Sequence, residues 1–503
     1  MDSHDIQNDE PGDTNANDPT FAHAVGCADC HRSDSAALDV EPVDHMPIPV
    51  EAVDGFADGV PRITRHDRRS FIKNGALGTL AVYGASKIDW TQAFEAAKAE
   101  AAVSGSVLVC LFLNGGYDGL HSFPTIGNEY GILQQERPGT IQALGASTPG
   151  QTGTTVIPGT GDQLGFTNVG VSGAGNNDQV VGFDTLWGAG DGGAGSDLAL
   201  WPAVNFFQNS SRSHFDSRDY WFRGATDDNT ITGWLGRWLD LYGSQDNPLQ
   251  AISLSSNLSK QIRTARAPVS ALTSLSGVDF RVDGARGTNA TDVMAAVSGV
   301  KADPRNEQLS HSRESYRRTV RVANALRALE GAPVNPGYPN SSLSTRLQLA
   351  ATLIAAGLGT RIVTIDWGSF DNHANIVNRM DPQITTLSHA LAAFQADLRV
   401  RGVEANVATM CFTEFGRRVG QNDNGTDHGT AGPMMMMGSR VRGGLAGEHP
   451  GIAPAARTRR GDDLRATVDP RQVYSQVMTE WLGGDPAAVM PGAPGPTTRP
   501  IFA

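Results

Sequence analysis

Residues 107–113 read Val-Leu-Val-Cys-Leu-Phe-Leu, an uninterrupted apolar run that is followed at once by Asn114 and a glycine pair. A continuous apolar run of this length is typical of a strand that is covered on both faces, as in a parallel sheet between helices. Similar runs occur later, RIVTIDW at 361–367 and NVATMCF at 406–412. Helical patterns separate them. We therefore predict an α/β fold with a mostly parallel central sheet and helices on both faces.

The segments between these runs have the periodicity of amphipathic helices. One apolar stripe at 387–398 consists of Leu387, Leu391, Phe394 and Leu398. Gly357 is placed to end the preceding helix, and a charged helix is expected at 307–329. The run GPMMMMGS at 432–439 predicts a further strand.

Composition excludes some partners and some kinds of fold. The chain has 503 residues, of which 39% are hydrophobic and 18% charged, so it can bury a large core. Its net charge of -13 argues against nucleic acid as a partner, because phosphate binding needs clustered Lys and Arg. Four cysteines are too few for a disulfide framework. Cys110 and Cys411 lie in strand-like runs and are expected to be small buried apolar groups, with their pairing left open.

An export signal is predicted at the Arg68-Arg69 pair. Residues 68–73 read RRSFIK, and the mildly apolar, glycine-rich stretch that follows is too short to span a bilayer. This pattern resembles a twin-arginine signal peptide, although an arginine pair in a surface loop is the alternative. Small residues at 97–99 offer a cleavage point. We expect a signal at 68–103, transport by the twin-arginine translocase to the periplasm or beyond, and one folded domain at 104–503.

Residues 1–67 lack apolar periodicity and are predicted to be a disordered extension. A start at Met46 would shorten it. Cys27 and Cys30, followed by His31, match the C-x-x-C-H pattern of haem attachment. A segment before a cleavable signal is removed with it, which argues against haem. Zinc on the two cysteines with His31 or His23 is an alternative, and an inert tail is the simplest expectation.

Acidic and histidine side chains follow several of the predicted strands. Because the carboxyl ends of parallel strands meet at one edge of a sheet, these side chains are expected to converge there. Oxygen and nitrogen ligands suit zinc, manganese or magnesium, so one or two divalent metals are predicted. A single Asp after a strand often caps a helix or turn, which is the alternative for two of them, Asp118 and Asp366. The candidate metal ligands are Asp118, Asp366, Asp371, His373, Glu414 and His428.

Several motifs resemble one family. In chain order they are LFLNGGYDGLHSF, SRSHFDSRDYW, GWLGRWL, IDWGSFDNHAN, TEFGRRV, GTDHGTAGPMMMMG and VYSQVMTEWLGG. They look like the domain of unknown function 1501 (DUF1501) family of exported proteins, which is related to the alkaline phosphatase and sulfatase superfamily. The resemblance runs from Arg68 to about Gly484. It implies an alkaline-phosphatase-like fold and a metal-dependent hydrolase of phosphate or sulfate esters, acting on a small-molecule or polymer substrate.

The superfamily resemblance also implies roles for individual residues. Asp366, Asp371 and His373 look like the ligands that follow one strand, and His428 resembles the last metal ligand. Glu414 looks like the acidic member of an Asp-His pair, but Phe415 replaces the histidine. The ligand after the first strand is Asn114 or Asp118. One metal site is therefore more complete than the other.

The resemblance places the nucleophile at the start of a helix. Ser213 suits this position, with Arg212 and Arg218 available to hold phosphate or sulfate oxygens. The alternative is an ordinary capping box of Ser213 with Asp216. Two functions stay open: a metal-dependent hydrolase, or a catalytically degenerate relative that serves as an envelope binding or assembly protein.

Overall fold

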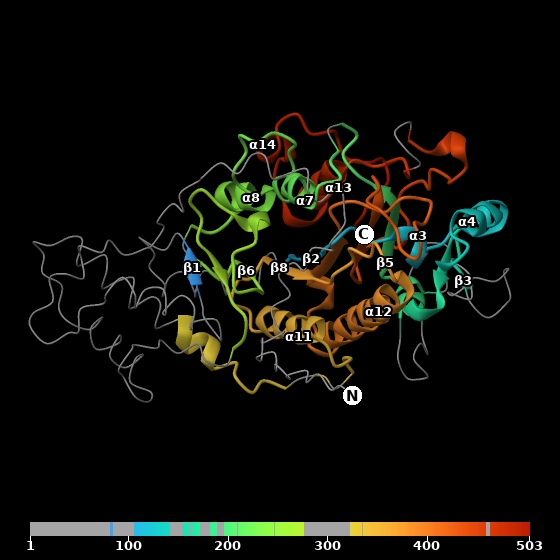
Figure 1. Ribbon diagram of the computed structural model, residues 1–503. Coiled ribbons are helices and arrows are strands. Elements are labelled where there is room, and N and C mark those ends of the chain that lie inside the picture. Colours follow the sequence, from blue (N-terminus) through green and yellow to red (C-terminus); the bar gives the residue numbers. More distant parts are fainter. Residues whose placement is uncertain are drawn as a thin grey trace, which may run out of the picture.

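A mixed sheet of nine strands forms the centre of the molecule (Figure 1). The computed structural model describes residues 81–83, 105–140, 154–160, 163–171, 182–188, 196–208, 210–245, 247–275, 322–333, 335, 337–458 and 463–503. Across the sheet the strands are β1 (Ala81–Tyr83), β7 (Val269–Ala271), β6 (Ala251–Ser253), β8 (Ile362–Trp367), β2 (Val107–Leu113), β9 (Val407–Phe412), β10 (Gly432–Met437), β5 (Leu198–Val204) and β11 (Gly444–Leu445).

The central strands run parallel, as the sequence predicts. All neighbours from β7 through β6, β8 and β2 to β9 are parallel, and β5 pairs with β11 in parallel. The methionine-rich run forms strand β10, which is antiparallel to both of its neighbours. Residues 413–431 therefore form a loop that leaves β9 and enters β10 at the same edge of the sheet. The expectation of an α/β fold with a mostly parallel sheet is confirmed.

The two faces of the sheet bury different side chains of strand β2. Val109 and Leu111 pack into the core cluster that includes α11 (Ser342–Ala355) and α12 (Ile376–Val400). Leu108, Cys110 and Phe112 pack into the cluster on the other face, with helices α7 (His214–Arg223), α8 (Trp234–Tyr242) and α13 (Pro470–Gln476). Figure 1 shows these two helical layers on opposite sides of the sheet. The run at 107–113 is apolar at every position because helices cover both faces of β2.

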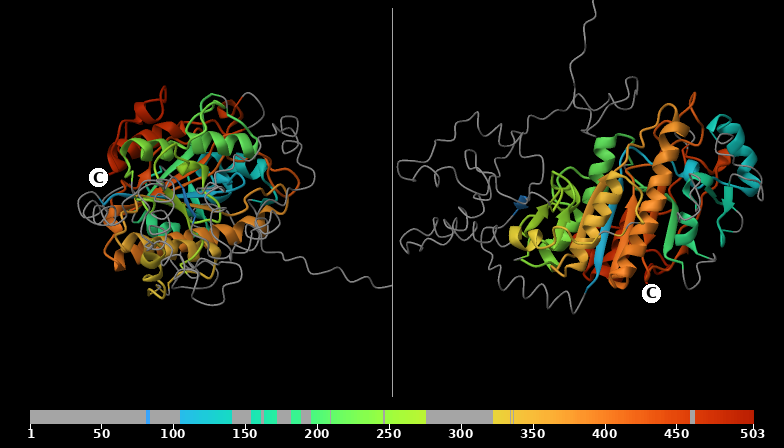
Figure 2. Two further views of the ribbon diagram at one scale, coloured as in Figure 1. Left: turned by 90° about the vertical axis from the view of Figure 1, so that its left-hand side faces the viewer. Right: turned by 90° about the horizontal axis from the view of Figure 1, so that it is seen from below.

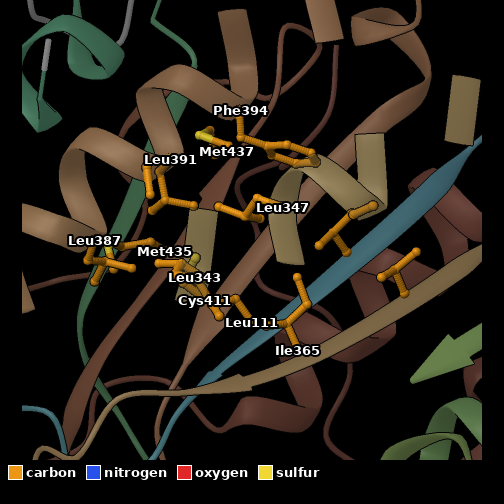
Figure 3. Packing of buried hydrophobic residues seen from close by; sticks show 14 of the residues in the cluster. Leu111, Leu343, Leu347, Ile365, Leu387, Leu391, Phe394, Cys411, Met435 and Met437 are labelled. Carbon is orange, nitrogen blue, oxygen red and sulfur yellow. The ribbon is translucent and has the colours of Figure 1, made fainter. Parts of the chain in front are cut away.

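Helix α12 carries the predicted apolar stripe. Leu387, Leu391, Phe394 and Leu398 are all fully buried. Figure 3 shows the first three with Leu343 and Leu347 of α11, above strand residues such as Leu111 and Ile365. The two helices lie side by side on this face of the sheet (Figure 2, right). Fully burying a side chain of this size stabilises the fold by roughly 1.5–3 kcal/mol, so this stripe fixes the helix on the sheet.

Three smaller expectations can be compared with the structure. Gly357 follows α11 with a φ of 64°, a left-handed conformation that suits glycine at a helix end. Cys110 and Cys411 are free and lie in the clusters on opposite faces, so they do not pair. Of the charged helix expected at 307–329, only residues 322–329 are described, where Ala323 and Leu326 are buried.

The remaining elements are short. They are α3 (Gly119–Ser122), α4 (Tyr130–Glu136), α6 (Phe183–Trp187), α14 (Pro486–Val489), the π-helical turn Val477–Leu482, and a separate hairpin of β3 (Thr154–Val156) and β4 (Gly165–Thr167). None of the helices in the described ranges has the length and apolar character needed to cross a membrane. The predicted extension at 1–67, including Cys27, Cys30 and His31, lies outside the described residues, as does the signal at 68–103 apart from β1.

Candidate metal centre

Three neighbouring parallel strands, β8, β2 and β9, end at the same edge of the sheet. The loops after them begin at Gly368, Asn114 and Thr413. Helix α7 begins at the same place, because its first residue, His214, lies 2.7 Å from Glu414 at the end of β9. The sheet topology thus brings together residues that are two hundred to about three hundred positions apart in the chain.

Three side chains at this edge form a group that could hold a metal ion. They are His214, Asp371 and His428, and one potential ligand atom of each lies within 4.8 Å of the others. His214 comes from the start of α7, Asp371 from the loop after β8, and His428 from the loop between β9 and β10. Asp371 and His428 were predicted as ligands from the sequence, whereas His214 was not.

The tautomer of His428 is set by the backbone. Its Nδ1 lies 2.9 Å from the carbonyl oxygen of Arg212, and a carbonyl can only accept, so Nδ1 carries the hydrogen. Burial, together with the charges of Arg417 and His214, lowers the pKa of His428 to about 4, and the ring is neutral at pH 7. Its Nε2 therefore presents a lone pair, 3.1 Å from Asp371 Oδ1. Two acceptors at this distance repel each other unless a cation or a shared proton lies near both.

His214 is oriented in a similar way. Its Nδ1 lies 2.7 Å from the Glu414 carboxylate, and its buried Nε2 has no hydrogen-bond partner among the described residues. The nearest group to Nε2 is Asp371 Oδ2 at 3.5 Å. Burial lowers the pKa of His214, but the carboxylates of Asp371 and Glu414 outweigh burial and raise it to about 9. A carboxylate that orients a histidine in this way is a common partner of metal ligands.

Asp371 lies at the centre of the group. Its Oδ1 accepts a hydrogen bond of 2.7 Å from Arg417 and lies 3.0 Å from His373 Nε2. Burial favours the neutral acid, but contacts with three histidines and the Arg417 charge hold the pKa of Asp371 well below its usual range. The carboxylate is therefore ionised at neutral pH.

His373 contacts two of the three members of the group, Asp371 and His428. Its Nε2 lies 3.0 Å from His428 Nε2, and its Nδ1 lies 3.0 Å from the Asp427 carboxylate. Asp427 is held in turn by Asn422. His373 therefore lies beside the group, and the Asp427 carboxylate is placed to orient its ring. The nitrogen-rich donor set, with an orphaned buried Nε2 on His214, fits a divalent metal such as zinc or manganese.

Besides His373, three predicted ligands stay outside the group. Asp118 caps α3 and forms a buried ion pair of 2.8 Å with Arg137, so it has the alternative, structural role. Asp366 is half-buried near the end of β8, where desolvation raises its pKa to about 6 and its buried Oδ1 has no hydrogen-bond partner among the described residues. Glu414 accepts hydrogen bonds from Gly115 N and Thr413 Oγ1, and it orients His214.

The predicted catalytic residues lie beside the group. Ser213 is the N-cap of α7, and its hydroxyl accepts a long hydrogen bond of 3.4 Å from Asp216 N. Arg212 forms an ion pair of 2.6 Å with Asp463, and its carbonyl fixes His428. Arg218 lies over the ring of Phe215 at 5.9 Å.

Sequence reasoning missed two residues of the site, His214 and Arg417. The only signal for His214 was its place directly after the candidate nucleophile at the start of a helix. Arg417 follows a strand like the predicted ligands do, but a positive charge gave no reason to place it beside a metal.

The comparisons with known proteins give a family. The profile of the family described as "Protein of unknown function (DUF1501)" matches residues 210–478, more than half of the chain. The chain belongs to this family. The match covers every member of the metal group of this DUF1501 protein, together with Arg417 and Glu414. Comparison with curated proteins found no match, and comparison with solved structures also found none.

Proposed function

We propose that this DUF1501 protein is a metal-dependent hydrolase of phosphate or sulfate esters. One divalent ion, zinc, manganese or magnesium, would be held by His214, Asp371 and His428, with His373 as a further ligand. The observation that carries the proposal is the convergence of these groups. The Arg212 carbonyl fixes Nε2 of His428 as a lone-pair donor, and the buried Nε2 of His214 has no hydrogen bond among the described residues and lies 3.5 Å from Asp371 Oδ2. A divalent ion bound here supplies a Lewis acid that polarises an ester oxygen.

The chain itself contributes binding and orientation. Helix α7 points its N-terminus at the centre, because its first residue is a proposed ligand. The partial positive charge at a helix N-terminus favours an anionic oxygen of a phosphate or sulfate group. Arg212 serves as a positioning residue. Its carbonyl oxygen accepts a hydrogen bond from His428 Nδ1, and its guanidinium forms an ion pair with Asp463.

Ser213 is the proposed nucleophile. It is adjacent in the chain to His214, and its hydroxyl oxygen accepts a long hydrogen bond of 3.4 Å from Asp216 N. In the attack, the Ser213 oxygen would form a bond to phosphorus or sulfur while the bond to the leaving oxygen breaks, and the hydroxyl proton would pass through solvent to that oxygen, which departs as the alcohol. Water would then release the phosphate or sulfate and restore the hydroxyl.

The wider context belongs to the same proposal. The motifs quoted above support an alkaline-phosphatase-like fold and a place in that superfamily. The arginine pair at 68–69 supports export in the folded state by the twin-arginine translocase, to the periplasm or beyond. The substrate would then be a small-molecule or polymer ester outside the cytoplasm.

The test combines metal content with hydrolysis. The exported protein is purified, its metals are measured by elemental analysis, and aryl phosphate and aryl sulfate esters are offered as substrates. We expect about one divalent ion per chain and hydrolysis that Ser213→Ala abolishes without loss of metal. Asp427→Asn should weaken metal binding roughly ten- to hundredfold, because it removes the group that orients His373. Absence of bound metal in the folded wild-type protein would refute the proposal.

A second candidate function rests on Phe415. Its ring packs 4.8 Å from the rings of both His214 and His428, at the position where the superfamily resemblance implies a histidine. This favours a relative that keeps one metal for structure and works as an envelope binding or assembly protein. Stoichiometric metal without hydrolysis of either ester class would support this candidate over the hydrolase.

A further inference from the structure

Arg417 is a buried cation in contact with the proposed metal group. Its side chain has no exposed surface, and its guanidinium lies 2.7 Å from Asp371 Oδ1. A buried positive charge beside a site for a divalent cation needs a reason, because two like charges close together in a dry interior repel each other strongly.

The guanidinium also joins the loops that carry the site. It donates to the carbonyl oxygens of Gly115 and Gly116 after β2, of Phe370 after β8, and of Thr426 in the loop between β9 and β10. Phe370 and Thr426 each lie within two residues of a proposed ligand. One planar group thus fixes the position of Asp371 relative to His428, without any metal.

The glycines after β2 allow this close approach. Gly115 and Gly116 have positive φ angles of 105° and 73°, which side-chain-bearing residues rarely adopt. A Cβ on Gly115 would lie 2.5 Å from Asp371 N, and one on Gly116 would lie 2.5 Å from the Phe415 ring. Both carbonyls can face Arg417 only because these positions are glycine.

We propose that Arg417 is the positioning residue that preforms the metal centre, and that its charge on Asp371 takes the place of a second metal ion. This inference rests on the proposed function. In two-metal sites the ions lie about 3.5–4 Å apart and share the charge of the groups between them. Here the permanent positive charge beside Asp371 is that of the Arg417 guanidinium and not that of a second ion. The centre therefore holds one ion, and its geometry exists before the ion binds.

The test replaces Arg417 by Lys, which keeps the charge but loses the fork that reaches several carbonyls. The probe is Co²⁺ alone, because its visible spectrum reports the coordination geometry. We expect the wild-type protein to bind one equivalent, and Arg417→Lys to bind at least about tenfold more weakly with an altered spectrum. Arg237→Lys is the matched control, since Arg237 also donates to three carbonyls, those of Arg223, Thr232 and Val489, and none of them lies in the loops after β2, β8 or β9.

The outcomes separate the two proposals. An unchanged spectrum in Arg417→Lys, or the same loss in Arg237→Lys, would overturn the positioning role. Two equivalents in the wild-type protein would overturn the single-ion assignment. No binding by the wild-type protein would remove the metal centre itself, and with it both proposals.

If Arg417→Lys does not fold, hydrogen exchange of the wild-type protein tests whether the centre is preformed before the ion binds. The amides of Gly115, Asn372 and Thr426 are hydrogen-bonded within the loops that Arg417 joins. In a preformed centre, added Co²⁺ changes their exchange by less than about threefold. Slowing on the order of a hundredfold would mean that the ion assembles the centre, which would overturn the inference.

Discussion

The proton on His214 should make metal binding depend steeply on pH. In the metal-free protein, two carboxylates raise the pKa of this histidine to about 9, so the ring is charged at pH 7. A metal ion can bind Nε2 only after that proton leaves. Each unit between the pKa and the working pH is worth about 1.4 kcal/mol. Because half of the rings are still protonated at pH 9, binding at pH 7 should be about fiftyfold weaker than at pH 9, with close to one proton released at pH 7.

The same proton gives the metal-free fold an opposite pH dependence. The pKa of His214 is higher in the folded protein than the ordinary 6.5, so its charge stabilises the fold fully below pH 6.5. That contribution, on the order of 3 kcal/mol, is lost as the pH rises through about 9. The metal-free protein should become less stable over this range while the metal binds more tightly.

Thermal melts with and without metal from pH 6.5 to 9 test both statements. The stabilisation by metal should grow with pH, and competition with a chelator of known pH behaviour should give the dissociation constant at each point. His214→Gln should bind more weakly and with a shallower slope. A stabilisation that stays constant over the range would refute the assignment of His214 as a protonated ligand.

Four further predictions concern single features of the chain. His428→Ala should remove the bound metal and any esterase activity while the protein stays folded, and an unchanged metal content would contradict the centre. Asp118→Asn breaks a buried ion pair whose two members are not proposed ligands, so it should lower the free energy of unfolding by about 3 kcal/mol but keep the metal, as melts and elemental analysis would show. Replacing Arg68 and Arg69 by Lys should leave precursor in the cytoplasm, and normal export in a fractionation assay would contradict the signal; deletion of residues 1–45 should leave the melting temperature of the exported form unchanged.

The fold was largely predictable because its strands and helices have strong patterns. The run at 107–113 is apolar throughout because both faces of β2 are covered, and the stripe on α12 repeats at helical spacing. The direction of β10 was not predictable. Its methionine run is fully buried, and a buried strand has the same sequence pattern in either direction.

The site was predictable only in part. Asp371 and His428 follow strands whose ends converge, and topology alone places them together. Asp118 also follows a strand, but the structure shows it pairing with Arg137, a partner that sequence spacing does not reveal. His214 joins the group from a helix on another part of the chain, so its place depends on tertiary packing.

The antiparallel direction of β10 has a consequence for how such a centre can change. Since β9 and β10 are joined directly, residues 413–431 carry Glu414, Phe415, Arg417, Asp427 and His428 on one continuous loop. Both ends of that loop are anchored in buried strands. Evolution or protein engineering could therefore exchange this whole loop in a single event, altering ligands and pocket shape together while the sheet beneath stays the same.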